Sequence, residues 1–149
     1  MRVLGLDPGL SATGYGLIEN QTVIEVGVIR ARRSKTLPEK IETIAADLEE
    51  LLRKYRPERC GLENVFYSKN PKTAILAAQL RGAFILLLQR YQVKIVELAP
   101  TRVKLALTGN GRASKGQVQY MVNHIFNIDR RLPPDAADAL AIAYCAVRV

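Results

Sequence analysis

The order of strand-like and helix-like segments constrains the fold of this sequence more than any other feature. Short runs rich in apolar and β-branched residues predict strands at residues 3–6, 14–18, 22–30, 59–63 and 93–98. Helical spacing of apolar residues predicts helices at residues 37–55, 71–91, 100–107 and 135–147, and a further helix that opens at Ser114. Three strands with a turn near residues 20–21 come first, and helices then alternate with strands. This order predicts an α/β or α+β fold built on a mixed sheet.

The bulk composition fits one folded domain. The chain has 149 residues, of which 48% are hydrophobic and 24% charged, so it can bury a substantial core. It shows no internal repeat or linker, and we expect one domain over residues 1–149. Cys60 and Cys145 lie in apolar surroundings without metal-ligand spacing, which predicts reduced core thiols in a cytoplasmic protein. We expect no membrane segment, because no apolar run approaches the ~18 residues of a span.

Four carboxylates occupy positions where an acid is costly to bury. Asp7 and Glu63 each follow an apolar, strand-like run. Asp135 and Asp138 are three residues apart on the last predicted helix, so they share one face. Mostly alanine residues lie between and after these two, which allows the helix to pack close to a sheet. Since desolvated acids are unfavourable unless a cation joins them, we expect the four carboxylates to converge at one rim of the sheet.

An all-oxygen cluster of this kind favours Mg²⁺ or Mn²⁺. Two such ions about 4 Å apart can activate water and stabilise the leaving oxygen of a phosphodiester. The net charge of +8 and the pI of about 9.8 favour nucleic acid as the partner, and a metal would let phosphate approach the acids. Simpler alternatives stay open: Asp7 caps the turn at residues 8–9, and Asp135 caps the last helix.

The predicted helix at residues 71–91 is apolar on nearly all sides. From Ala74 to Leu88 only Gln79 and Arg81 are strongly polar, whereas a surface helix has a single apolar stripe. Two interpretations remain open: burial on every side within the monomer, or a two-fold partner that covers the second face. His124 lies in the predicted helix that precedes the last one, and we interpret it as a structural residue.

Three stretches keep a recognisable order and spacing across nearly the whole chain. They are GLDPG at residues 5–9 with TGYG at 13–16, ENVF at 63–66, and DAADALA at 135–141. Together they resemble the RuvC family of bacterial Holliday junction resolvases. The resemblance implies a ribonuclease H-like fold, with a mixed five-stranded sheet flanked by helices, in a single nuclease domain. It also implies that the catalytic metal ligands are Asp7, Glu63, Asp135 and Asp138.

The resemblance further implies an endodeoxyribonuclease with two Mg²⁺ ions per active site, for which Mn²⁺ can substitute. Such an enzyme makes paired, symmetric nicks in four-way DNA junctions during recombination and repair, as a homodimer that works with a RuvA and RuvB branch-migration complex. Phe66 resembles the aromatic residue that stacks on junction bases, and Lys104 and Lys115 match basic positions that contact DNA or assist catalysis. The alternatives are that Phe66 belongs to the core and that Lys104 is a solvated side chain.

Three other functions share some of these sequence features. Sugar kinases and actin-like ATPases share the Gly-x-Asp-x-Gly opening, but they need two such domains, and this sequence also lacks the glycine-rich phosphate loops. A related nuclease that cuts RNA or flapped DNA would have similar acids, so only its substrate separates it. A non-catalytic junction-binding protein would lack metal-dependent cleavage.

Overall fold

The computed structural model of the chain describes residues 1–32, 36–64 and 70–149. The strands in these ranges are β1 (Arg2–Asp7), β2 (Thr13–Glu19), β3 (Thr22–Ile29), β4 (Arg59–Glu63) and β5 (Lys94–Leu98). The helices are α1 (Leu37–Tyr55), α2 (Pro71–Arg90), α3 (Pro100–Thr108), α4 (Lys115–Ile125) and α5 (Pro134–Val147). Every predicted element is therefore confirmed, with ends that shift by no more than one residue.

The described strands form one mixed sheet in the order β3-β2-β1-β4-β5. The pairs β1–β2 and β2–β3 are antiparallel, whereas β1–β4 and β4–β5 are parallel. Asn20 and Gln21 both have positive φ, 51° and 64°, so a tight turn joins β2 to β3 where the sequence predicts one. The prediction of a mixed five-stranded sheet is confirmed.

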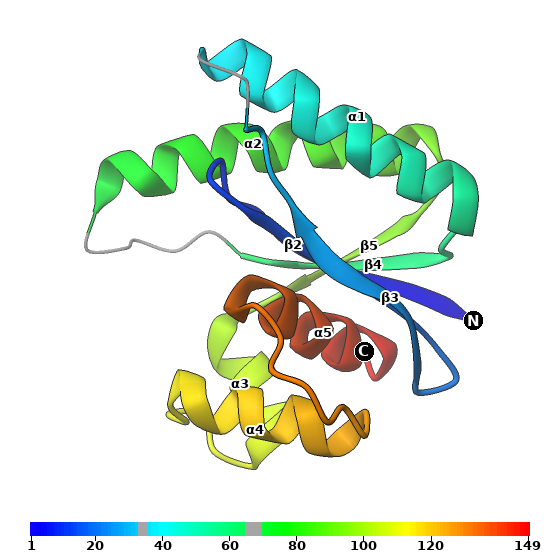
Figure 1. Ribbon diagram of the computed structural model, residues 1–149, viewed down its shortest axis with the longest axis vertical. Helices are drawn as coiled ribbons and strands as arrows, with labels where there is room; N and C mark the ends of the chain where they lie inside the picture. The colour runs from blue at the N-terminus through cyan, green and yellow to red at the C-terminus, as the bar shows by residue number, and fades with distance from the viewer. Residues whose placement is uncertain (33–35, 65–69) are drawn as a thin grey trace.

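Helices cover both faces of the sheet in separate layers (Figure 1). Helices α1 and α2 lie together on one face, and α5 lies across the other. Helices α3 and α4 pack on the far side of α5 and form a lobe away from the sheet. Helix α5 is thus enclosed between the sheet and this lobe, and most of its residues are buried.

The alternation of side chains along each strand divides the core into two clusters. On β1, Leu4 and Leu6 face the α1–α2 layer, whereas Val3 belongs to the core on the α5 side. Strand β4 follows the same rule, with Cys60 and Leu62 on the α1–α2 side. The residues that follow Leu6 and Leu62 therefore point toward α5.

Helix α5 approaches the sheet closely because glycine faces alanine across the contact. A Cβ atom on Gly5 would overlap the Ala139 carbonyl and come within 2.6 Å of the Ala143 nitrogen. A Cβ atom on Gly14 would overlap the Asp135 carbonyl. These glycines set the depth of α5, and so the position of the acids that it carries.

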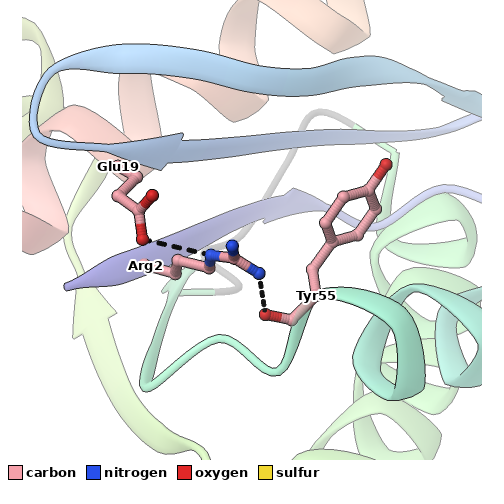
Figure 2. Close-up of polar contacts among 3 residues, drawn as sticks. All are labelled: Arg2, Glu19 and Tyr55. Atoms are coloured by element: carbon pink, nitrogen blue, oxygen red, sulfur yellow. Dashed lines mark hydrogen bonds and ion pairs between the residues drawn. The ribbon is translucent and has the colours of Figure 1, made fainter.

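The end of the sheet opposite the acids is held by Arg2, at the start of β1. Figure 2 shows its guanidinium between two partners: an ion pair with Glu19 (Nε to Oε2, 3.1 Å) and a hydrogen bond to the Tyr55 carbonyl (2.8 Å). These contacts join β1 to the end of β2 and to the last residue of α1. They fix the sheet against the α1 layer far from Asp7.

Helix α2 is only partly covered. Leu80, Phe84, Leu87 and Leu88 are buried, whereas Ile75 is 60% exposed and Leu86 is 53% exposed. The interpretation that this helix is buried on every side is therefore wrong. By length and composition α2 could cross a membrane, but its buried face packs against α1 and β5 in this fold.

Candidate active site

Asp7 and Glu63 come together because they end neighbouring parallel strands. Asp7 is the last residue of β1 and Glu63 the last residue of β4, and Leu6 pairs with Leu62 just before them. Both positions alternate onto the face that α5 covers. The sequence prediction that these two acids lie at one rim of the sheet is thus met by the topology.

Asp135 and Asp138 reach the same rim from the first turns of α5. Carboxylate oxygens of Asp7, Asp135 and Asp138 all lie within 4.8 Å of one another. Pro133 is the N-cap residue of this helix, and Asp135 lies in its first turn, aimed at the cluster. The alternative that Asp135 acts as the cap residue is therefore wrong.

Glu63 stands slightly apart from these three acids. It lines a cavity of about 270 Å³ with Asp138, Lys104 and Lys115, among other residues. The sequence predicts four acids in one cluster, whereas the structure groups three of them within 4.8 Å and places Glu63 in the adjoining cavity, which Asp138 also lines.

The environment of these acids disfavours their charged forms. Burial, followed by the charges of Asp138, Asp135 and Glu63, raises the pKa of Asp7 from 3.8 to about 7, although Lys115 opposes this shift. Burial is also the main cause that raises the pKa of Glu63 and the pKa of Asp138. The site therefore holds more negative charge than its own side chains can stabilise.

Lys115 supplies part of the missing positive charge. Its Nζ lies 3.2 Å from Oδ2 of Asp138, and both side chains remain partly exposed. Partial burial works against the ammonium ion, but the charge and hydrogen bond of Asp138, with the charges of Asp7 and Asp135, raise the pKa of Lys115. Lys104 is half-buried in the wall of the same cavity. Both predicted lysines thus lie beside the acids.

Thr13 is a supporting residue whose role the sequence analysis missed. Its side chain is completely buried, and its hydroxyl donates to the Gly9 carbonyl (2.8 Å) while accepting from the Gly9 N–H (3.2 Å). The turn after Asp7 is therefore held by Thr13, which weakens the alternative that Asp7 is present to cap it. A hydroxyl residue four positions after a turn glycine was the available signal.

Phe66, the predicted stacking residue, lies outside the described residues. The candidate metal ligands among the described residues are carboxylate oxygens. The two cysteines, Cys60 and Cys145, are buried free thiols and do not belong to this group. Such a set fits a hard divalent cation, and partly desolvated acids with raised pKa values are what such an ion would stabilise.

Comparison with known proteins gives consistent matches over almost the whole chain. The family model described as "Crossover junction endodeoxyribonuclease RuvC" matches residues 3–146. A protein of that name from Chlorobium chlorochromatii is 41% identical over 152 residues, covering 99% of this chain and 79% of the relative. One from Caldanaerobacter subterraneus subsp. tengcongensis is 41% identical over 150 residues, covering 97% of this chain and 91% of the relative.

Solved structures give the same result for the fold. The structure of T. thermophilus RuvC in complex with a Holliday junction substrate is similar to this chain with a TM-score of 0.89 and 29% identity, covering 97% of this chain and 92% of that one. The yeast mitochondrial Holliday junction resolvase Ydc2 is similar in fold, with a TM-score of 0.67 and 18% identity, covering 98% of this chain and 77% of that one.

Proposed function

The chain belongs to the RuvC family of crossover junction endodeoxyribonucleases, and we infer that it resolves four-way DNA junctions by cutting phosphodiester bonds. Its fold is the mixed-sheet, ribonuclease H-like α/β fold that the sequence predicts. The observation that carries the inference is the convergence of Asp7, Asp135 and Asp138 on one point of this fold. The family model and the relatives described above are named as crossover junction endodeoxyribonucleases, which favours this function over an ATPase, an RNA or flap nuclease or a non-catalytic binder.

The catalytic site that we propose consists of Asp7, Glu63, Asp135 and Asp138. The three clustered acids would hold a divalent cation, and Glu63 with Asp138 would hold a second across the adjoining cavity. Mg²⁺, for which Mn²⁺ can substitute, would supply Lewis-acid stabilisation and a nucleophilic water. The protein's own contribution is to hold the carboxylates in place through the close packing of α5 on the sheet.

Lys104 and Lys115 bind the DNA strand in this proposal. Both line the cavity that contains Glu63 and Asp138, so their ammonium groups lie where a phosphate must enter. Charge-assisted bonds to phosphate oxygens would orient the strand for in-line attack. Phe66, which follows Glu63 closely in sequence, is proposed to stack on junction bases.

Paired cuts in two strands of one junction require two active sites, and so two copies of the chain. We propose that these copies form a homodimer with α2 at its interface. Ile75 and Leu86 expose large apolar side chains on this helix. Gly82 lies in the middle of α2, and no atom of the described residues is within 4 Å of the position that its Cβ would occupy. Glycine lowers the stability of a helix, and no contact within the described monomer requires it at this position. A glycine there would allow the close approach of a partner helix.

The remaining parts of the proposal concern the cellular setting. We expect a cytoplasmic enzyme that receives its junctions from a RuvA and RuvB branch-migration complex. This expectation rests on family membership alone.

The decisive experiment is cleavage of an immobile four-way junction, compared with linear duplex, a flap and an RNA–DNA hybrid, with and without Mg²⁺. Paired symmetric nicks in the junction, only with metal, are the expected result. Preferred cleavage of the flap or hybrid would assign the chain to a different nuclease activity. Binding to the junction without any metal-dependent cleavage would instead support the non-catalytic function.

A further inference from the structure

The lobe formed by α3 and α4 has an unusual distribution of charge. From residue 98 to residue 128 the sequence contains neither Asp nor Glu, although the chain has 14 of them. The same stretch carries four permanent positive charges, on Arg102, Lys104, Arg112 and Lys115. A surface of this sign attracts phosphate, and two of its lysines already line the catalytic cavity.

A second cavity in this lobe adjoins the catalytic one. It has a volume of about 550 Å³ and is lined by Thr108, Asn110, Ser114, Gly116, Gln117, Tyr120 and Met121. Ser114 and Gly116 flank Lys115, which lines the catalytic cavity, so the first turn of α4 separates the two spaces. We call the second space the α3–α4 groove. A strand that leaves the acids past Lys115 would meet it next.

Tyr120 gives this groove an exposed aromatic wall. Its side chain is 69% exposed, and its ring is stacked on that of His124, with centroids 6.3 Å apart and planes within 6° of parallel. His124 is itself exposed beside Tyr120 on α4, so its interpretation as a structural residue stays a prediction. An exposed aromatic ring at the wall of a groove is suited to stacking on a nucleobase.

Gly116 points to the same use of the groove. A Cβ atom at this position would meet no atom closer than the Ser114 Oγ at 3.9 Å, so packing within the described chain does not require glycine. Glycine within a helix is unfavourable relative to alanine. Its presence in the first turn of α4 is explained if a ligand approaches the backbone closely there.

We propose that the α3–α4 groove binds one unpaired nucleotide of the junction strand that leaves the catalytic cavity, with its base stacked on Tyr120. This proposal rests on the proposed function, since that function supplies the DNA. The exchange point of a junction interrupts the continuous base stack, so a base there can unpair and turn outward at a lower free-energy cost than a base inside a continuous duplex. A protein partner would find no acidic residue in this lobe with which to pair its own basic side chains.

The test compares Tyr120→Ala with Tyr120→Phe. Junction affinity is measured by fluorescence anisotropy with metal chelated, at several salt concentrations. The loss of one stacked base should weaken binding of the Tyr120→Ala protein roughly 5- to 150-fold, whereas Tyr120→Phe keeps the ring and the affinity. The dependence on salt should be unchanged, because no phosphate contact is lost. Duplex affinity should be the same for all three proteins.

Photo-cross-linking locates the base directly. Junctions carrying 5-iodouracil at successive positions around the exchange point are irradiated with the wild-type protein, and the modified residue is identified by mass spectrometry. A cross-link on Tyr120 supports the proposal. Unchanged affinity of Tyr120→Ala, with no cross-link on Tyr120 at any position, overturns it. If the wild-type protein neither binds nor cuts junctions, the proposed function fails instead.

Gly116→Ala separates binding from folding. The added methyl group should raise the melting temperature, since it improves helix propensity without a clash. It should also weaken junction binding by occupying space in the groove. A protein that is more stable but binds junctions as well as the wild type would contradict a close approach of DNA at this turn.

Discussion

The two faces of the sheet are packed in opposite ways. On one face, large side chains such as Leu48, Leu62 and Phe84 fill the space between the sheet and α1–α2. On the other face, Gly5 lies directly against Ala139 of α5, with little side-chain volume between the backbones. Side chains can adjust to a change in volume, whereas two backbones in contact cannot. The face that requires accurate placement of acids is thus the one with the least freedom to move.

The largest effect is expected from removing charge on the α5 face without changing its shape. Asp7→Asn should reduce junction cleavage by at least about 100-fold, because a carboxylate of the metal cluster is lost, while junction binding is retained. The matched control is Asp47→Asn, which changes an exposed carboxylate on α1 and should leave cleavage unaltered. Gel assays of cleavage and binding measure both. An Asp7→Asn protein that cuts at the normal rate would remove Asp7 from the site.

The next effect compares the two packing modes directly. Gly14→Ala places a methyl group on the Asp135 carbonyl, so the first turn of α5 must move, and cleavage should fall by about 10- to 100-fold. Leu48→Ala, in the core under α1, should instead lower the free energy of unfolding by about 2–5 kcal/mol with cleavage per folded molecule preserved. Urea denaturation and single-turnover cleavage provide the two measurements. Equal losses of cleavage activity in both variants would contradict the inference that the α5 face, and not the α1–α2 face, positions the acids.

The outer surface of the α1–α2 layer provides a third test. Leu86→Arg should convert dimers into monomers, since it places a charge on the exposed apolar side of α2. Leu105→Arg makes the same change at a leucine of similar exposure on α3 and should leave the dimer intact. Multi-angle light scattering reports the mass of each. A monomeric wild-type protein would refute the interface.

A smaller effect concerns the lysine beside the acids. Lys115→Gln should increase the affinity for Mg²⁺ in the absence of DNA by about 3- to 10-fold, because the ammonium group competes for Asp138. Lys104→Gln, in the same cavity but facing Glu63, should change it less. Isothermal titration calorimetry measures both affinities. Weaker metal binding by Lys115→Gln would show that this lysine supports the metal site.

The last effect concerns stability without metal. The pKa of Asp7 is about 7 in the folded protein against 3.8 ordinarily, so its protonated form favours the folded state. Its contribution to stability is complete below pH 3.8 and is lost as the pH rises toward 7. Chelated wild-type protein should therefore lose more stability between pH 5 and pH 8 than Asp7→Asn does, as measured by urea denaturation. Parallel pH profiles for the two proteins would contradict the shift.

The sequence predicts which strands and helices carry the acids of the site better than it predicts the contacts between their side chains. Strand alternation and helical spacing are local properties, which is why the rim that carries Asp7 and Asp138 could be located in advance. The ion pair of Lys115 with Asp138 depends on how α4 packs against α5, and no local pattern encodes that distance. The partly covered state of α2 was undecided because its composition fits both burial and association.

The contact between β1 and α5 also affects the order in which the site assembles during synthesis and folding. Chains are made from the N-terminus, so Asp7 is present long before α5, which supplies the other two carboxylates of the group. Contacts between such distant segments form late, because closing a long loop is entropically unfavourable. The group of carboxylates proposed to hold the metal therefore cannot assemble before α5 has been made and has packed on the sheet.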